Sequence, residues 1–262
     1  MNLNEVGNSV LDLAKEVGEF IIEQGKIFTS DKIEEKGPQD FVSYVDKEAE
    51  SMLVKGLKEI IPESGFIVEE NSASNANEDY IWIVDPLDGT TNFIHNLAPH
   101  AISIALQKNK KTVLGVIYEL GHKELFYSWD GLPVYLNTKE ISVTKSTLIS
   151  EGLFATGFSN SDHSRLTGHL KVVKKIIENS HGLRRHGSAA TDLAYVAAGI
   201  FDGFFEYGLS VWDIAAGAYL VERAGGKVSD YSGKDNYFFG REMLAGNKQI
   251  HAELLNILKE NM

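Results

Sequence analysis

The feature that most constrains this fold is a short apolar segment that runs directly into a bend containing two aspartates. The segment is Tyr80–Val84, and its β-branched residues predict a buried strand. Asp85 follows at once, and Pro86 and Gly89 predict that the chain bends as it leaves the strand. Asp88 lies three residues after Asp85, so the two carboxylates can face one small volume. We therefore expect the rest of the chain to be arranged around the end of this strand.

The residues of the bend itself leave two interpretations open. Backbone N–H groups beside Gly89 and Thr90 can point at an anion, especially if a helix begins there, and the carboxylates are suited to Mg²⁺ that carries substrate phosphate. Alternatively, Asp-Gly is a common turn dipeptide, and the segment could close a hairpin with a solvated aspartate. The spacing does not match the calcium-loop pattern D-x-[DN]-x-[DN]-G. Further acids elsewhere in the chain would decide between these interpretations.

Composition limits the classes of function. The 262 residues are enough for one large domain or two tightly joined halves. Acids outnumber bases by 37 to 25, and the net charge of −12 argues against direct nucleic-acid binding while allowing a local metal-bearing pocket. The absence of cysteine excludes disulfides and thiolate metal sites. The N-terminal segment carries Glu5, Asp12 and Glu16 without an apolar core, and no apolar run approaches the roughly 18 residues of a membrane span. We expect a cytoplasmic protein without membrane contact.

Periodicity in the first part of the chain predicts two helices and a strand around the bend. Apolar residues from Leu3 to Ile22 follow a helical spacing with an acidic outer face. A loop and short strand precede Asp46, which would begin a second amphipathic helix, where capping and the helix dipole favour a carboxylate. That is a sufficient structural reason for Asp46 taken alone. The segment Gly65–Val68 reads as a strand that delivers Glu69 and Glu70, and residues 71–79 read as a loop.

The remaining chain predicts an antiparallel sheet followed by an α/β half. The expected elements are strands at 101–106, 112–119 and 125–129, a turn at Asn109-Lys110, a loop at 129–137, a strand at 152–156, helices at 165–178 and 189–200, a strand at 201–207, a helix at 213–224, short strands at 227–228 and 243–245, and a last helix at 250–258. The eight histidines show no paired zinc spacing, and each is expected at the surface or the edge of the core. Nucleophile-elbow and P-loop patterns are absent.

Further acids fall into ordered segments that accompany the bend. These segments are Lys36, Asp40 and Asp46 in K-x(3)-D-x-V-[ST]-x(2)-D, the pair Glu69-Glu70, the bend Asp85-Pro86-Leu87-Asp88-Gly89-Thr90-Thr91-Asn92-Phe93, the stretch Gly187-Ser188-Ala189-Ala190 with Glu206, and Trp212-Asp213-Ile214-Ala215-Ala216-Gly217. Together they resemble the inositol monophosphatase family of magnesium-dependent, lithium-sensitive phosphatases. The resemblance extends over nearly the whole chain.

The resemblance implies a fold and an arrangement of the site. The expected fold is α+β, a layered αβαβα sandwich of the sugar-phosphatase type that is usually homodimeric. An N-terminal half, residues 1–147, would carry most metal ligands, and a C-terminal half, residues 148–262, would carry substrate contacts and Asp213. The site would lie in a cleft between the two tightly packed halves.

The resemblance also implies a role for each site residue. Two Mg²⁺ ions, with a weaker third, would be held by Glu69, Asp85, the carbonyl of Leu87, Asp88 and Asp213. Thr90 and Asp46 would orient the attacking water, with Glu69 a further catalytic group. Substrate would be bound by Asp88, Gly89, Thr90, Gly187, Ser188, Ala189, Glu206 and Asp213, with the amides of Gly89 and Thr90 on the phosphate.

The chemistry of phosphate monoesters agrees with this set of residues. Their uncatalysed hydrolysis is among the slowest of reactions, and two metal ions can activate water, align the phosphoryl oxygens and stabilise the leaving alkoxide. Within the family, enzymes that act on 3′-phosphoadenosine nucleotides tend to have a lysine and an acid after D-G-T. Here Thr91-Asn92-Phe93 follows instead, so the resemblance implies inositol 1-phosphate as the leading substrate. The alternatives are fructose 1,6-bisphosphate, NADP, histidinol phosphate, a 3′-phosphoadenosine nucleotide, and action mainly through a protein partner.

Overall fold

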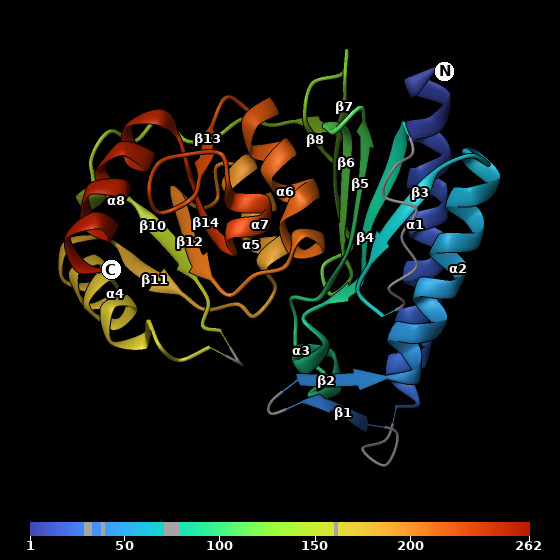
Figure 1. The fold of residues 1–262 in the computed structure, drawn as a ribbon, viewed down its shortest axis with the longest axis horizontal. Helices are drawn as coiled ribbons and strands as arrows, with labels where there is room; N and C mark the ends of the chain where they lie inside the picture. Colours follow the sequence, from blue (N-terminus) through green and yellow to red (C-terminus); the bar gives the residue numbers. More distant parts are fainter. Residues whose placement is uncertain (29–32, 38–39, 71–78, 160–161) are drawn as a thin grey trace.

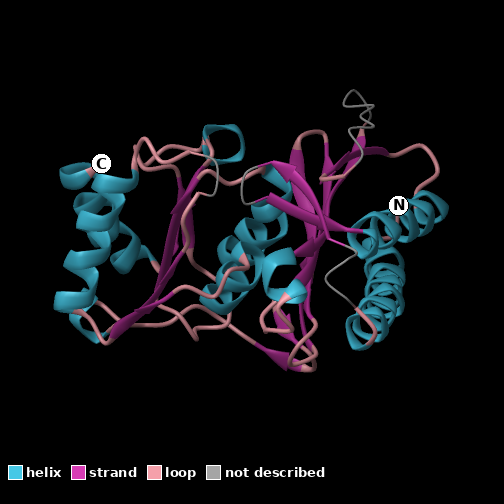
Figure 2. Cartoon of the chain, turned by 90° about the horizontal axis from the view of Figure 1, so that it is seen from below, coloured by secondary structure: helices cyan, strands magenta, loops and turns pink. Residues whose placement is uncertain are grey.

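The chain folds into five alternating layers of helix and sheet (Figures 1 and 2). The computed structural model describes residues 1–28, 33–37, 40–70, 79–159 and 162–262. A seven-stranded sheet and a five-stranded sheet lie on either side of a central helical layer, and each sheet is covered on its outer face by a further helix pair. The predicted αβαβα sandwich is therefore confirmed.

The first outer layer consists of the two predicted N-terminal helices, α1 (Leu3–Lys26) and α2 (Tyr44–Ile60). Their apolar faces pack on the seven-stranded sheet in one buried cluster that includes Val10, Leu53 and Trp82. Between the helices, β1 (Ile33–Gly37) and β2 (Asp40–Ser43) form a separate antiparallel pair. The side chains of Lys36 and Asp40 lie outside the described part of the structure.

The seven-stranded sheet has the order β3-β4-β5-β6-β7-β8-β9. Its strands are β3 (Gly65–Val68), β4 (Tyr80–Asp88), β5 (Ala101–Lys108), β6 (Lys111–Glu119), β7 (Glu124–Trp129), β8 (Tyr135–Leu136) and β9 (Lys139–Glu140). Only the β3–β4 pair is parallel among the described pairs of this sheet. The loop predicted at 129–137 is partly wrong, because Tyr135 pairs with Tyr127 and stacks on its ring at 5.6 Å between centroids.

Strand β4 differs from the sequence prediction at its C-terminal end. We expected the strand to end at Asp85, but it continues to Asp88 across an irregularity in its pairing with β5. Pro86 has no N–H to donate, and the Leu87 N–H donates to Asp85 Oδ1 at 2.9 Å. The bend is therefore a local distortion inside the strand, and Asp85 stays in the core with 1% of its surface exposed.

The five-stranded sheet has the order β11-β10-β12-β14-β13. Its strands are β10 (Leu153–Thr156), β11 (Gly182–Arg184), β12 (Gly203–Tyr207), β13 (Lys227–Ser229) and β14 (Glu242–Gly246). Helices α4 (Leu166–Asn179) and α8 (Lys248–Asn261) cover its outer face. Three short helices lie outside these layers, namely α3 (Thr90–Ile94), the 3₁₀ helix η2 (Ile149–Glu151) and α7 (Tyr237–Gly240). The boundary between halves at 147/148 stays a prediction.

The central layer consists of α5 (Ala189–Ala197) and α6 (Val211–Arg223), which contact both sheets. Small residues make this close packing possible. A side-chain carbon at Gly217 of α6 would lie 2.5 Å from Leu193 of α5, and one at Gly115 of β6 would lie 3.0 Å from the Ala216 carbonyl oxygen. Glycine at these positions lets α6 approach α5 and the sheet, which fixes the position of the α6 N-terminus. Among the described residues, no helix is both long and apolar enough to cross a membrane.

Two histidines contradict the expectation that all eight lie at the surface or core edge. His169 and His251 are fully buried. Each has Nε2 at hydrogen-bond distance from a hydroxyl, 3.1 Å from Thr156 and 2.8 Å from Ser229. Burial lowers the pKa of each ring to about 4. The two rings are thus neutral parts of the core of the C-terminal half.

Replacing both rings, with His169→Gln and His251→Gln, is expected to flatten the acid dependence of stability. The folded pKa of about 4 is below the usual 6.5, so the unfolded chain binds protons first as pH falls, and stability is lost from about pH 6.5 downward. At pH 4.5 the loss is expected to be about 2–3 kcal/mol per ring. Urea unfolding at pH 7 and pH 4.5 measures it. Equal loss in the parent and the double variant would contradict this role.

Candidate functional site

The predicted acidic metal ligands lie at the C-terminal ends of β3 and β4 and at the N-terminus of α6. Because β3 and β4 are parallel, with Val68 opposite Val84, the residues after each partner lie side by side, and Glu69 lies beside Asp85. Asp88 ends β4. Asp213 lies in the first turn of α6, where its Oδ2 accepts from the Ser210 N–H at 2.7 Å. The fold thus brings together four predicted ligands from residues 69 to 213.

These carboxylates repel one another in a buried setting. Burial first, and then Glu69, Asp88 and Asp213, hold the pKa of Asp85 well above its usual range. Burial and then Asp88 likewise hold the pKa of Asp213 well above its usual range. Burial also raises the pKa of Asp88 to about 6 despite the donors Ser188 and Ala190. Such a group is stable in ionised form only if positive charge is brought to it.

The donor set fits a hard divalent cation. Among the described residues, Asp85 accepts a hydrogen bond only at Oδ1, from the Leu87 N–H, and Asp213 accepts one only at Oδ2, from the Ser210 N–H. The second oxygen of each carboxylate therefore has no donor within the described part of the chain. All donors are oxygens, which Mg²⁺ prefers. No group of three among these four acids has its ligand atoms within 4.8 Å of one another in the described structure.

A different group, of two glutamates and a histidine, does have its ligand atoms within 4.8 Å of one another. The ligand atoms of Glu119, His122 and Glu124, at the turn between β6 and β7, lie within 4.8 Å of one another. Glu119 is buried, and its oxygens accept from the N–H groups of Gly121 at 2.9 Å and His122 at 2.6 Å. Glu124 accepts from the Tyr195 hydroxyl at 3.0 Å. These bonds give the group a structural role in holding the turn.

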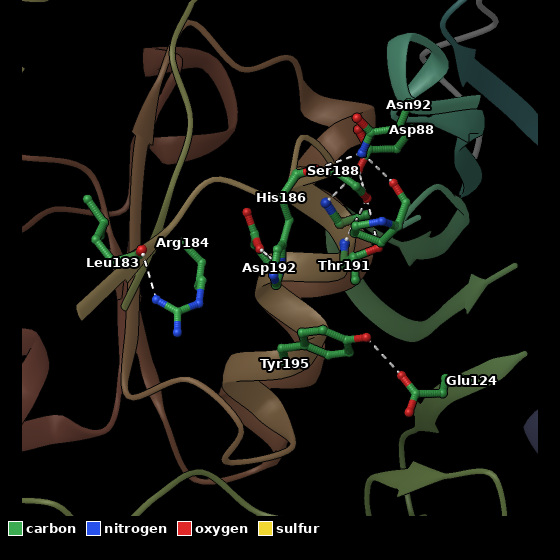
Figure 3. A network of polar contacts seen from close by, with 12 residues as sticks. Asp88, Asn92, Glu124, Leu183, Arg184, His186, Ser188, Thr191, Asp192 and Tyr195 are labelled. Carbon is green, nitrogen blue, oxygen red and sulfur yellow. Dashed lines mark hydrogen bonds and ion pairs between the residues drawn. The ribbon is translucent and has the colours of Figure 1, made fainter. Parts of the chain in front are cut away.

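Asp88 joins the end of β4 to the start of α5 (Figure 3). Its Oδ2 accepts from the Ser188 hydroxyl and from the Ala190 N–H, both at 2.7 Å. Ser188 is the N-cap of α5 and accepts from the Thr191 N–H at 3.2 Å. The carboxylate at the end of β4 is therefore fixed to the first turn of α5, and the Ser188 side chain, 1% exposed, is held in this contact.

Thr90 and Asp46 are connected as predicted, and Asp46 also caps its helix. Asp46 Oδ2 accepts from the N–H of Ser43 at 2.9 Å and from its hydroxyl at 2.6 Å, which completes a capping box at the start of α2. The other oxygen, Oδ1, accepts from the Thr90 hydroxyl at 2.9 Å. Burial raises the pKa of Asp46 against these donors. The structural and the functional interpretation of Asp46 therefore apply to different oxygens of one carboxylate.

Thr90 has two acceptors for its single hydroxyl proton. Besides Asp46, the carbonyl of Leu87 lies 3.0 Å from Thr90 Oγ1. Bonds to an ionised carboxylate are stronger than bonds to a neutral carbonyl. Because its proton is directed toward Asp46, the Thr90 oxygen keeps lone pairs that can accept a hydrogen bond from another group.

Two predicted substrate segments touch through glycines. Gly89 precedes α3 with a left-handed φ of 90°, and a side-chain carbon on it would lie 3.1 Å from the Gly187 carbonyl oxygen. Asn92, to which the sequence analysis assigned no role, donates to the carbonyls of Pro99 at 2.7 Å and His186 at 2.6 Å. Asn92 thus holds the bend of the N-terminal half against the Gly187 segment. The only sequence signal for this role of Asn92 is its position inside the bend motif.

Helix α5 and strand β12 contribute Ala189 and a second set of charges. Ala189 is the first residue of α5, directly after Ser188. Glu206 of β12 packs on Gly157, where any side chain would collide with its carboxylate. Burial and then Asp192 hold the pKa of Glu206 well above its usual range. Asp192, which the sequence analysis missed, lies with Oδ1 3.0 Å from His186 Nδ1 (Figure 3), and burial raises its pKa to about 6.

A hollow of about 180 Å³ adjoins the α6 N-terminus. It is lined by Leu209, Ser210, Val211, Trp212, Phe238, Phe239 and Arg241. Ser210 and Trp212 belong to the same turn as Asp213, so the hollow lies next to the acid group. The predicted cleft between the halves itself stays a prediction.

Comparison with known proteins gives a consistent family. The inositol monophosphatase family model matches residues 2–262. The putative Nus factor SuhB of Neisseria meningitidis serogroup B is 36% identical over 261 residues, 99% of this chain and all of that protein. The inositol-1-monophosphatase of Mesorhizobium japonicum is 39% identical over 226 residues, covering 86% and 85% of the two chains. The crystal structure of extragenic suppressor protein suhB from Bartonella henselae superposes with a TM-score of 0.92 at 35% identity, covering 97% and 98%.

Proposed function

The chain belongs to the inositol monophosphatase family, and on that premise we propose that it hydrolyses a small phosphate monoester with Mg²⁺, inositol 1-phosphate being the leading substrate. The observation that carries this proposal is the buried acid group beside an oriented hydroxyl. Burial and neighbouring acids hold the pKa of Asp85 and of Asp213 well above its usual range, and the Thr90 hydroxyl donates to Asp46. The name of the Mesorhizobium relative supports the same substrate class.

We assign the cations to two places in this acid group. Glu69, Asp85 and the Leu87 carbonyl would hold one Mg²⁺, Asp85, Asp88 and Asp213 would hold a second, and Glu69 would assist with a weaker third. Bound Mg²⁺ would lower the pKa of water and neutralise charge on the phosphoryl and leaving oxygens. Asp85 is shared by the two places, and its burial and its bond from Leu87 support a fixed orientation.

The chain's own residues would position water and phosphate. Thr90, donating to Asp46 Oδ1, can accept a hydrogen bond from water, which would direct a lone pair of that water toward phosphorus. We assign the phosphate oxygens to the amides of Gly89 and Thr90. The remaining contacts to the alcohol part of the substrate fall to Gly187, Ser188, Ala189, Glu206, Asp88 and Asp213. No covalent phosphoryl-enzyme is needed in this scheme.

The proposal is tested by a panel of phosphate monoesters assayed with Mg²⁺. The panel contains inositol 1-phosphate, fructose 1,6-bisphosphate, NADP, histidinol phosphate and a 3′-phosphoadenosine nucleotide. We expect the largest kcat/KM for inositol 1-phosphate. If another member of the panel has a larger kcat/KM than inositol 1-phosphate, the protein is still a phosphatase but its preferred substrate is that compound. Absence of phosphate release from every member would contradict the proposed function.

Lithium is expected to inhibit uncompetitively with respect to substrate. The expectation rests on the family, in which Li⁺ enters the second metal position after the leaving group departs. The matching position here consists of Asp85, Asp88 and Asp213, all oxygen donors that a small hard cation can use. Steady-state kinetics at fixed Mg²⁺ and several Li⁺ concentrations measure the pattern. Purely competitive inhibition, or no inhibition at roughly 10⁻³ M Li⁺ or above, would contradict binding of Li⁺ to the product-bound state. Neither result would contradict the proposed Mg²⁺-dependent hydrolysis.

A second candidate function is a role through a protein partner. This role is supported by the name of the Neisseria relative, a putative Nus factor. The net charge of −12 argues against direct RNA binding. We further propose that the protein is a homodimer located in the cytoplasm, as the resemblance to the family suggests. Light scattering of the purified chain tests the dimer.

A further inference from the structure

Helix α2 carries two buried acids on one face, and each contacts the end of a different strand. Asp46 and Glu50 lie one turn apart, and each is 1% exposed. Asp46 accepts from the hydroxyl of Thr90, just after β4. Glu50 Oε2 accepts from the N–H of Glu70, just after β3, at 2.7 Å. Because β3 and β4 are adjacent parallel strands, a single helix thus holds both strand ends.

The bond to Glu50 fixes the backbone next to a proposed cation ligand. The Glu70 N–H belongs to the planar peptide group that also contains the Glu69 Cα, so holding this N–H restrains where the Glu69 side chain begins. At 2.7 Å the bond is at the short end of the range for N–H···O bonds. Burial first and then Glu69 raise the pKa of Asp85, so the Glu69 carboxylate lies beside the acid group. Glu50 can therefore position Glu69 without contacting a cation.

The fold itself gains little from an acid at position 50. The other oxygen of Glu50, Oε1, is buried and has no hydrogen-bond partner within the described part of the chain. Burying a carboxyl group costs free energy, and a single donor offsets only part of that cost. Further along the same face of α2, Leu53 and Leu57 fill the core without such a cost. The contact between Glu50 and Glu70 therefore needs an explanation other than stability.

We propose that Glu50 is a positioning residue that holds Glu69 in the orientation in which it binds Mg²⁺. Replacing a residue that orients a metal ligand typically lowers metal affinity or activity by about 10–100-fold. The role of Glu50 rests on the proposed function, because Glu69 is taken there as a cation ligand. Helix α2 would then serve both parts of the site, cation binding through Glu50 and orientation of water through Asp46.

Two substitutions separate the hydrogen bond of Glu50 from its acidity. Glu50→Gln removes the acid but keeps an oxygen that can accept from the Glu70 N–H, and its NH₂ group would take the place of Oε1, which no described donor faces. Glu50→Asp keeps the acid but withdraws the carboxyl by one C–C bond, about 1.5 Å, which is beyond hydrogen-bond range of that N–H. If Glu50 acts by holding Glu70, only Glu50→Asp should weaken Mg²⁺ binding.

The Mg²⁺ Kd of each variant is measured without substrate, from the rise in Tm of chelator-dialysed protein as Mg²⁺ is added. We expect Glu50→Asp to raise the Kd about tenfold or more and Glu50→Gln to change it less than about threefold. Glu50→Met, which has no oxygen acceptor, should match Glu50→Asp and replaces it if the shorter side chain disturbs folding. Similar Kd values in Glu50→Asp and Glu50→Gln, or a larger loss in Glu50→Gln, would overturn the proposal.

A double-variant cycle tests whether Glu50 acts through Glu69. Glu69→Ala removes the proposed ligand and should itself raise the Mg²⁺ Kd. Adding Glu50→Asp to Glu69→Ala should then raise the Kd by less than about twofold, because a ligand that is absent cannot be mispositioned. If the two losses multiply instead, Glu50 acts independently of Glu69 and the proposal is overturned.

The same Kd values separate the role of Glu50 from the phosphatase activity. If Glu50→Asp weakens Mg²⁺ binding through Glu69 in a chain that releases no phosphate from any monoester, the proposed function is wrong and the role of Glu50 is kept. If the chain releases phosphate but Glu50→Asp binds Mg²⁺ as the parent does, the role of Glu50 is wrong and the proposed function is kept. A parent whose Tm does not respond to Mg²⁺ would contradict both.

Discussion

Replacing Asp85 by asparagine is expected to abolish phosphate release while making the metal-free protein more stable. Asp85 is the proposed ligand shared by two cations, and metal ions supply several kcal/mol of transition-state stabilisation, so kcat/KM should fall by about 10³-fold or more. Burial and the neighbouring acids raise the folded pKa of Asp85, so its ionised form opposes folding and the parent loses stability as pH rises through that pKa. The neutral amide removes this charge.

The stability gain in Asp85→Asn is measured by thermal unfolding at pH 7 after dialysis against a chelator. A gain of about 1 kcal/mol or more corresponds to about 2–4 °C in Tm for a chain of this size. Added Mg²⁺ should raise the Tm of the parent and not that of the variant. Asp213→Asn should behave in the same way, since the amide oxygen can still accept from Ser210.

Glu70→Gln is the matched control for the acid group. Glu70 follows Glu69 directly, but its backbone N–H donates to Glu50 Oε2 at 2.7 Å, and we assign it no cation. The activity of Glu70→Gln should remain within a few-fold of that of the parent.

Two results would contradict the view that these acids are held together for cations. One is a metal-free Asp85→Asn variant that is less stable than the metal-free parent, and the other is an Asp85→Asn variant whose activity is close to that of the parent.

Asp46→Asn and Thr90→Val are expected to lower kcat by about 10²-fold, with a small change in KM, because groups that position a reacting proton contribute on that scale. The asparagine oxygen can replace Asp46 Oδ2 at the cap, but its NH₂ group would then face Thr90 and cannot accept from it. Valine keeps the shape of Thr90 and removes the hydroxyl. Steady-state kinetics on inositol 1-phosphate separate kcat from KM.

Ser43→Ala is the control that tests the cap alone. It removes the hydroxyl that donates to Asp46 Oδ2 and accepts from the Val45 N–H, and it leaves the Thr90 bond in place. Stability should fall by about 0.5–2 kcal/mol with kcat per folded molecule unchanged. If Asp46→Asn shows this same pattern, Asp46 is a helix cap and has no role in orienting water.

The local patterns of the sequence were sufficient for the elements that carry the site. The apolar run before Asp85 predicts β4, and the helical spacing after Asp46 predicts α2, with Asp46 in its first turn as observed. Glu69 beside Asp85 follows once β3 and β4 are parallel. The strand end itself was misplaced, because the Leu87 bond to Asp85 keeps the chain in the sheet through Asp88.

Contacts between the halves could not be predicted in the same way. The bonds from Asp88 to Ser188 and Ala190, and from Asn92 to His186, join residues about one hundred positions apart. They depend on how α5 lies between the two sheets, which no local pattern encodes. Burial of His169 and His251 depends likewise on the packing of α4 and α8 on the second sheet.

The central claim is that the acid group around Asp85 hydrolyses a phosphate monoester only with a divalent cation. Its most direct test is the initial rate of phosphate release from inositol 1-phosphate by the purified full chain, first freed of cations and then titrated with Mg²⁺. We expect no release without Mg²⁺, a saturable rise with it, and no rise in Asp85→Asn at any concentration. Release at an undiminished rate without cations, or the same Mg²⁺ response in Asp85→Asn as in the parent, would contradict the account.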